Sequence, residues 1–291
     1  MVSRIDFTVD PEQFLAVAEV YLAADPVVTT VIATVTRRLA DRGVGDAPYR
    51  WWAVAGDDRD RVCGVAMRTA PFAPYPLYVL PMPEDAAVSL ARALHERGEE
   101  VGGVNGALPA SRLLAEEYAR LAGAEVVVHE HLRLFELGDL VEPAPPPGRL
   151  RAATRADADL CLAWFVDFAR AAAEQAGRTD PHAMEEFTMD EMLARIDDGV
   201  IWLWEVDDEV VHLTGANLPA NGVVRIGPVY TPGEHRGAGV PATAVAEISR
   251  QHVEQGVRCC LFTDQANPVS NHIYEQIGFR PVVDMVNLLV G

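Results

Sequence analysis

Cysteine is scarce in this sequence, and the cysteines that occur form no metal-binding or redox pattern. The chain has four of them, which are Cys63, Cys161, Cys259 and Cys260. None belongs to a C-x-x-C pair, the spacing found in zinc sites and in thiol–disulfide motifs. Sparse, unpatterned cysteine is typical of proteins from reducing compartments. We therefore expect a cytoplasmic protein with no metal site.

Positive charge is also scarce. The chain has 24 Lys and Arg against 43 Asp and Glu, which gives a formal net charge of −19. Such a surface repels nucleic-acid phosphates and anionic lipid head groups, so neither nucleic acid nor a membrane is an expected partner. The acidity either serves solubility alone or attracts cationic ligands, and amines are cations at neutral pH.

Long hydrophobic runs are missing from the sequence. No apolar stretch approaches the roughly 20 residues that a helix needs to span a bilayer. Residues 1–6 lack the basic segment followed by an apolar one that marks a signal peptide. The length of 291 residues suits two domains, since domains usually have roughly 100–200 residues each.

A proline-rich segment divides the chain almost in half. Residues 142–148 read Glu-Pro-Ala-Pro-Pro-Pro-Gly. Because proline has no backbone N–H, this segment propagates neither a helix nor a sheet, and we expect an extended spacer. The sequence therefore predicts one domain over residues 1–141, a linker over 142–148 and a second domain over 149–291.

The second half alternates between helical and strand patterns. Apolar residues at helical spacing predict two helices, and three strands follow, two of them joined by the strong hairpin signal Asn221-Gly222. The predicted elements are helices 157–176 and 180–196, strands 200–206, 210–218 and 223–230, helix 241–255, strand 257–263, helix 267–277 and strand 280–290. This order indicates an α/β (α+β) fold with a mixed, mostly antiparallel twisted sheet flanked by helices.

The first half repeats this order in outline, which indicates a duplicated fold. Its predicted elements are helices 11–24 and 27–41, strands 51–55, 61–68 and 77–80, helix 84–97, strand 101–104, helix 110–121 and a last stretch over 125–137. The halves differ after the third strand, where the first half has only residues 81–85 and the second has residues 231–243. We therefore expect the first domain to lack the site that this longer loop builds.

The longer loop has the features of a phosphate-binding turn. Gly237 and Gly239 let the backbone adopt positive φ and approach a ligand closely. The helix that follows leaves unpaired N–H groups and partial positive charge at its start, which together suit a diphosphate. Arg236 adds a charge-assisted contact. Taken alone, the same pattern also fits a plain connection, and it is neither a P-loop nor a dinucleotide-binding fingerprint.

The run Arg236-Gly237-Ala238-Gly239-Val240 resembles the signature of the GCN5-related N-acetyltransferase (GNAT) family, which is Arg or Gln, two residues, Gly, one residue, and Gly or Ala. The resemblance implies that these five residues bind acetyl-CoA as co-substrate. The sixth position is Pro241, and proline removes one N–H that would face the diphosphate. We expect weaker CoA binding or a shifted diphosphate, since proline is tolerated in the first helical turn.

Residues 263–279 strengthen the resemblance, which covers residues 152–290 well and the first half only in outline. In the family, an asparagine after the strand contacts the cofactor arm, and a tyrosine lies four residues before Gly-Phe or Gly-Tyr. The resemblance implies that Asn267 and Asn271 bind CoA and that Tyr274 is the general acid. Tyr118 of the first half lies five residues before Gly123, a shift that turns a helical side chain by about 100°.

The family geometry also implies where the acyl group lies. The third and fourth strands of the second domain splay apart, and the pantetheine arm lies between them against Val229, Tyr230 and Thr231. The N–H of Val229 would polarise the thioester carbonyl. The general base stays open between Glu205, which could deprotonate the ammonium directly or through water, and His212 on the next strand, and for each of them a structural role is the favoured interpretation.

These expectations lead to two functions. The first is an N-acyltransferase that moves an acetyl group from acetyl-CoA to a primary amine of a small molecule or peptide, acting as a monomer or homodimer. The second is an acyl-CoA-binding sensor without catalysis. The acceptor is not readable from the sequence. Acidic residues of the second predicted helix either bind a cationic acceptor or form a solvated face, and these are Asp180, Glu185, Glu186, Asp190 and Glu191.

Overall fold

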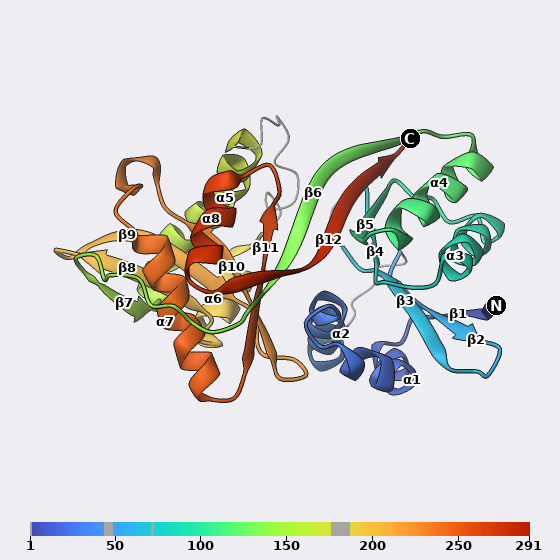
Figure 1. Cartoon of the computed structure of the whole chain (residues 1–291), viewed down its shortest axis with the longest axis horizontal. Coiled ribbons are helices and arrows are strands. Elements are labelled where there is room, and N and C mark those ends of the chain that lie inside the picture. The colour runs from blue at the N-terminus through green and yellow to red at the C-terminus, as the bar shows by residue number, and fades with distance from the viewer. Residues whose placement is uncertain (1, 44–48, 71–72, 176–186) are drawn as a thin grey trace. The chain divides into compact units, whose positions relative to one another are not determined.

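A computed structural model describes residues 2–43, 49–70, 73–175 and 187–291, which form two compact units. The first unit comprises Met1–Leu134 together with Val282–Gly291, and the second comprises Phe135–Pro281. Each unit has a mixed, mostly antiparallel sheet with helices packed on it (Figure 1), which confirms the predicted fold class. The proline-rich segment at 142–148 lies inside the second unit.

The first unit contains two helical pairs and the strands between them. Its strands follow the order β1-β2-β3-β4-β5-β12-β6 across the sheet. The elements are β1 (Val2–Thr8), α1 (Pro11–Ala24), α2 (Thr30–Arg42), β2 (Trp51–Asp57), β3 (Val62–Arg68), β4 (Leu77–Val79), α3 (Glu84–Glu96), β5 (Gly103–Ala107), α4 (Ala110–Ala122), and parts of β6 (Val126–Leu137) and β12 (Phe279–Val290). Strand β1 was not predicted from the sequence.

Consecutive tryptophans show how this sheet buries both of its faces. The Trp52 ring lies 6.1 Å from that of Phe14 in α1, and its indole N–H donates to the Thr36 hydroxyl in α2 at 2.8 Å. Trp51 belongs to the opposite core, with Leu90 of α3 and Leu114 of α4. Because neighbouring residues of a strand point to opposite faces, one Trp-Trp pair anchors a helical pair on each side.

Strands β6 and β12 each continue from one unit into the other. Residues Met285–Leu289 of β12 pair antiparallel with β5 and complete the sheet of the first unit. Phe135, near the end of β6, is fully buried in the core of the second unit. Each unit is therefore completed by a strand segment from the other half of the sequence.

The second unit carries the remaining elements, with the strand order β7-β8-β9-β10-β11-β6. They are β7 (Arg149–Ala152), the short 3-10 turn Arg155–Asp157, α5 (Ala158–Gln175), α6 (Met189–Asp197), β8 (Ile201–Val206), β9 (Glu209–Ala216), β10 (Val223–Tyr230), the 3-10 turn Gly233–His235, α7 (Val240–Glu254), β11 (Arg258–Asp264) and α8 (Pro268–Gln276). Strand β7 was not predicted from the sequence.

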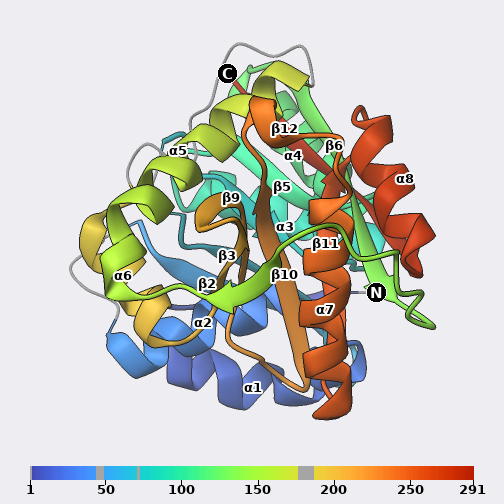
Figure 2. The same ribbon diagram turned by 90° about the vertical axis from the view of Figure 1, so that its left-hand side faces the viewer.

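Helices cover both faces of this second sheet (Figure 2). Helices α5 and α6 pack Phe165 and Met192 against Ile201 and Leu203 of β8. Helices α7 and α8 belong to a different core, which includes Ile226 of β10. The helical pair that precedes the sheet in the sequence and the pair that follows it therefore lie on opposite faces.

Local signals explain two features of this unit. Thr188 and Glu191 form a capping box, in which each side chain bonds the other residue's backbone N–H, so α6 starts at Met189. The predicted helix over 180–196 is thus helical from Met189, while residues 176–186 lie outside the described part of the chain. Asn221 and Gly222 both have positive φ, 50° and 72°, as a tight hairpin between β9 and β10 requires.

Candidate functional site

The site begins where two neighbouring strands separate. Strand β10 pairs in parallel with β11 only from Val223 to Arg225, opposite Arg258 to Cys260. Beyond that point β10 keeps its pairing with β9, interrupted by a bulge between Ile226 and Val229. The two strands diverge there, and a cavity of about 580 Å³ opens between them. This is the splay expected from the sequence.

Six segments of the second unit line this cavity. They are the end of β10, the loop and first turn of α7, the end of β11, one side of α8, and short stretches of α5 and of the proline-rich segment. The residues expected to bind the cofactor that do line it are Val229, Tyr230, Thr231, Arg236, Gly237, Gly239 and Asn267, together with Tyr274. Ala238, Val240, Asn271 and Glu205 lie outside its lining.

The loop before α7 has the predicted backbone. Gly237 and Gly239 have φ of 85° and 79°, a region that side-chain-bearing residues rarely adopt. Gly239 caps α7, and its carbonyl accepts the N–H of Thr243. Pro241 is the second helical residue, so the first turn offers one fewer N–H to the cavity than it would with any other residue there.

The Arg236 side chain is hydrogen-bonded to the backbone just after β10. Its Nε donates to the carbonyl oxygen of Thr231 at 3.0 Å. Arg236 lines the cavity, and its guanidinium supplies charged donors. Since an arginine can bind a phosphate through two parallel N–H groups, this placement suits an anionic ligand.

His212 is buried behind Thr231 and joins two threonines. Its Nδ1 lies 2.7 Å from the Thr231 hydroxyl and its Nε2 lies 2.7 Å from the Thr214 hydroxyl. Burial lowers the pKa of His212 to about 3, so the imidazole is neutral at physiological pH. It does not line the cavity, and both ring nitrogens are engaged, so the geometry favours the structural interpretation over the role of a base.

Tyr274 lies in α8 and faces the cavity from within the core. Its residue is 8% exposed, and its ring lies edge-on to Phe279 with 6.1 Å between centroids. Burial raises the pKa of Tyr274 above its ordinary value, so the phenol stays protonated at neutral pH. A second tyrosine, Tyr230, is half-buried in the lining and contacts the Trp164 ring.

The two asparagines differ in position. The Asn267 side chain caps α8 by accepting the N–H of Ser270 at 3.1 Å, and the residue lines the cavity. The Asn271 amide bonds the Thr263 hydroxyl and the Asp264 carbonyl, which ties α8 to the end of β11. Asn271 thus supports the wall of the cavity from outside.

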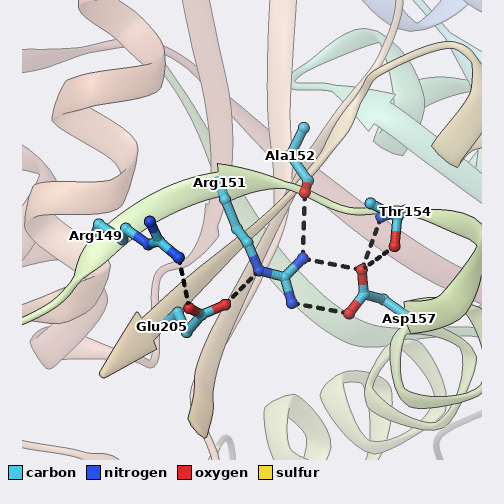
Figure 3. Close-up of polar contacts among 6 residues, drawn as sticks. All are labelled: Arg149, Arg151, Ala152, Thr154, Asp157 and Glu205. Carbon is cyan, nitrogen blue, oxygen red and sulfur yellow. Dashed lines mark hydrogen bonds and ion pairs between the residues drawn. The ribbon is translucent and has the colours of Figure 1, made fainter. Parts of the chain in front are cut away.

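Glu205 lies in an ion-pair cluster away from the cavity (Figure 3). Its carboxylate accepts from Arg151 Nε at 2.6 Å and from Arg149 at 2.9 Å, and Arg151 also binds Asp157. The hydrogen bond from Arg151 is the main cause that lowers the pKa of Glu205. A carboxylate with both oxygens engaged and a lowered pKa is a poor proton acceptor, so the geometry favours a structural role.

The first unit is closed at the corresponding position. Strand β4 has three residues, and all of them pair with β5. At Gly106, φ is 139° and a Cβ atom would overlap the carbonyl oxygen of Val79. The two strands therefore lie in close backbone contact, and helix α3 begins five residues after β4 without a glycine loop. Strands β4 and β5 thus show none of the divergence that opens the cavity between β10 and β11 in the second unit.

Other parts of the lining had no clear signal in the sequence. Phe168 and Ala171 reach the cavity from α5, and Pro143 and Ala144 from the proline-rich segment. Their contacts join segments distant in the chain, which local patterns do not encode. Of the acidic residues considered as an acceptor site, Asp180, Glu185 and Glu186 lie outside the described residues, and Asp190 and Glu191 belong to the first turn of α6.

The described residues contain neither a metal-binding cluster nor a membrane-spanning helix. Within them, no cluster of three or more His, Cys, Asp or Glu side chains has the geometry to hold a metal ion. Among the helices that the structure describes, none is both long and apolar enough to cross a bilayer.

Comparisons with known proteins agree with this geometry. Residues 206–286 match the family model described as FR47-like protein. That stretch includes β9, β10, the glycine loop, α7, β11 and α8. It therefore contains the two strands that diverge, β10 and β11. No curated protein matches the chain in sequence.

Solved structures show the same fold over nearly the whole chain. A GNAT-family acetyltransferase from Colwellia psychrerythraea has a TM-score of 0.59 at 11% identity and covers 99% of both chains. A GCN5-related N-acetyltransferase from Sphaerobacter thermophilus has a TM-score of 0.62 at 16% identity, over 98% of this chain and 95% of the other. A tandem GNAT protein from the clavulanic acid biosynthesis pathway has a TM-score of 0.59 at 14% identity, over 99% and 98%.

Proposed function

Because the chain shares its fold with solved GNAT acetyltransferases and residues 206–286 match the FR47-like family model, we propose that it is a member of the GCN5-related N-acetyltransferase family that transfers an acetyl group from acetyl-CoA to a primary amine. The observation that carries the proposal is the cavity between β10 and β11, which joins a glycine loop at a helix N-terminus to a buried tyrosine. A diphosphate, an extended arm and a thioester need these parts in this order.

The glycine loop and the first turn of α7 suit the diphosphate of CoA. Backbone N–H groups and the partial positive charge of a helix N-terminus favour an anion there, and Arg236 adds a guanidinium. Of the five loop residues expected from the sequence, Arg236, Gly237 and Gly239 line the cavity. Ala238 and Val240 would contribute through their backbone N–H groups.

The free edge of β10 suits the pantetheine arm. Beyond Arg225 its pairing partner is β9 alone, so the backbone that faces β11 is available for hydrogen bonds. Val229, Tyr230 and Thr231 line the cavity along this edge. The arm would lie there as an added strand, and the N–H of Val229 would polarise the thioester carbonyl.

Tyr274 is the group to which we assign protonation of the departing thiolate. The amine nitrogen attacks the carbonyl carbon, the C–S bond breaks, and the departing thiolate takes a proton, while the nitrogen gives up one to solvent. Tyr274 lines the cavity, and a tyrosine phenol is protonated at neutral pH, so it can supply the thiolate proton. Glu205 and His212, the bases considered from the sequence, are engaged in structural contacts, so we assign the second proton transfer to neither.

The acceptor would be a small molecule or peptide with a primary amine. The formal net charge of −19 favours encounter with a cationic partner over an anionic one. The full-length protein should be tested with acetyl-CoA and a panel of polyamines, aminoglycosides, amino acids and peptides, with release of the thiol as readout. At least one amine should give thiol release above the hydrolytic background.

Binding and turnover should be measured separately in that experiment. If CoA binds but no amine in the panel is acetylated, the alternative of a non-catalytic acyl-CoA sensor replaces the enzyme. If neither CoA nor acetyl-CoA shifts the thermal unfolding midpoint, the assignment of the cavity as an acyl-CoA site is wrong.

A further inference from the structure

The proline-rich segment at 142–148 is held at both of its ends. The Val141 N–H, just before it, donates to the carbonyl oxygen of Ile277 at the end of α8, at 3.1 Å. The carbonyl oxygen of Pro147 accepts the indole N–H of Trp204 at 2.9 Å. The segment therefore runs from α8 to β8 with both ends fixed, which a free spacer would not do.

Between these two anchors the segment borders the cavity. Pro143 and Ala144 belong to the lining, as does Gln276 at the end of α8. The neighbouring Glu142 lies 3.6 Å from Arg250 of α7. The segment thus crosses from α8 toward α7, the two helices on one face of the second sheet (Figure 2).

The cavity reaches both faces of that sheet. Phe168 and Ala171 line it from α5, which packs on the opposite face from α7 and α8. The cavity between β10 and β11 is therefore bordered by α5 on one face of the sheet and by the proline-rich segment on the other, and we call these two sides its mouths. Gly239, Pro241 and Ala242 at the start of α7 line the same cavity as Pro143 and Ala144, so the glycine loop and the segment border one cavity on the α7 side of the sheet.

The chemistry of CoA then fixes which end of the molecule lies at each mouth. The diphosphate joins the pantetheine arm to the adenosine. With the diphosphate at α7 and the arm directed between the strands toward α5, the adenosine must leave through the mouth beside the proline-rich segment. We infer that Pro143 and Ala144 bind the adenosine end of acyl-CoA by packing against it.

The composition of the segment suits this contact. Proline rings give a flat apolar surface, and their fixed φ means that little conformational entropy is lost when a ligand packs on them. This inference rests on the proposed function, because it takes acyl-CoA as the ligand. It adds a binding segment outside the regular helices and strands.

The test is to obstruct this mouth without disturbing the fold. Ala144→Trp places a large side chain in the lining, and Pro145→Trp is the matched control, because Pro145 is an exposed neighbour that does not line the cavity. Calorimetry on the full chain would measure binding of CoA, of adenosine 3′,5′-bisphosphate and of pantetheine. Thermal unfolding would check that both variants fold like the wild type.

We expect Ala144→Trp to weaken the binding of CoA and of adenosine 3′,5′-bisphosphate at least tenfold and to leave the affinity for pantetheine unchanged. Pro145→Trp should bind all three within about twofold of the wild type. Wild-type affinity of Ala144→Trp for CoA would overturn the inference while leaving the proposed function intact. Equal loss of CoA and pantetheine would overturn it too, since the segment would then shape the whole cleft. A wild type that binds no CoA would instead refute the proposed function.

Discussion

His212 on β9 lies within hydrogen-bonding distance of Thr231 at the end of β10, with 2.7 Å between Nδ1 and the hydroxyl oxygen. The carbonyl of the same threonine accepts from Arg236 Nε. A line of contacts therefore leads from a fully buried imidazole to the guanidinium of the glycine loop. The neutral form of His212 holds this line, because a charged imidazole would be buried without a compensating anion in contact.

Protonation of His212 should couple stability to pH. Its pKa is lowered from 6.5 to about 3 by burial, so below pH 6.5 the unfolded chain takes up a proton that the folded chain refuses. The free energy of unfolding should fall by up to about 1.4 kcal/mol per pH unit from this residue. Urea unfolding at pH 7.5, 6.5 and 5.5 would measure the slope.

Replacement of the histidine gives the control for that slope. His212→Gln should flatten the pH dependence of the free energy of unfolding between pH 6.5 and 5.5, whatever its effect on absolute stability. Burial also lowers the pKa of His252, which acts in the same direction, so His252→Gln is the matched comparison. Equal slopes in the wild type and His212→Gln would contradict the assignment.

Tyr274→Phe tests the acid. Removal of the hydroxyl should lower kcat at least tenfold, since general acids typically contribute 10²–10⁴-fold, while the affinity for CoA should stay within about twofold. Tyr230→Phe is the control, because Tyr230 lines the same cavity without the assigned role. Steady-state kinetics with an identified acceptor would measure kcat for both variants. Equal losses of kcat in the two would count against Tyr274 as the acid.

Pro241→Ala should tighten CoA binding. The substitution restores an N–H in the first turn of α7, beside the glycine loop, and a hydrogen bond to a charged group contributes about 1.5–3 kcal/mol. Part of that would be lost to desolvation, so we expect a gain in affinity of roughly fivefold. Pro268→Ala makes the same change in the first turn of α8 at a residue outside the cavity lining. An unchanged or lower affinity in Pro241→Ala would show that the diphosphate does not use this position.

Gly106→Ala tests the closed strand pair of the first unit. The new Cβ would overlap the Val79 carbonyl, and φ is 139°, so strands β4 and β5 would have to separate. We expect a loss of several kcal/mol, at the upper end for single substitutions, seen as a lower unfolding midpoint. Gly56→Ala, in β2, is the control, since no atom lies within 4 Å of its added Cβ. Similar midpoints for the two variants would contradict the close approach.

The sequence predicted the elements whose signals are local. Hydrophobic periodicity located most helices and strands, Asn221-Gly222 located a hairpin, and the two glycines of the loop located a turn with positive φ before α7. Strands β1 and β7 were missed because both lie at the edge of a sheet, where one face of a strand carries little apolar pattern. Their partners are set by long-range pairing.

The candidate site shows the same division. Val229, Arg236 and Tyr274 were located by motif and lie together at one cavity. Glu205 was considered because of its strand position, but sequence spacing does not reveal that Arg149 and Arg151 occupy its carboxylate. Pro143 and Ala144 read as a spacer, because the anchors that bring them to the cavity lie in α8 and β8.

The pairing of β12 with β5 has a consequence for biosynthesis. Residues 103–107 are synthesised well before their partners at 285–289. Until residues 285–289 are made, β5 lacks this partner and presents an open strand edge, and such edges invite pairing with other chains. A nascent chain is therefore exposed to aggregation at this edge of the first unit, and a stop codon before residue 285 would remove a strand from the N-terminal unit.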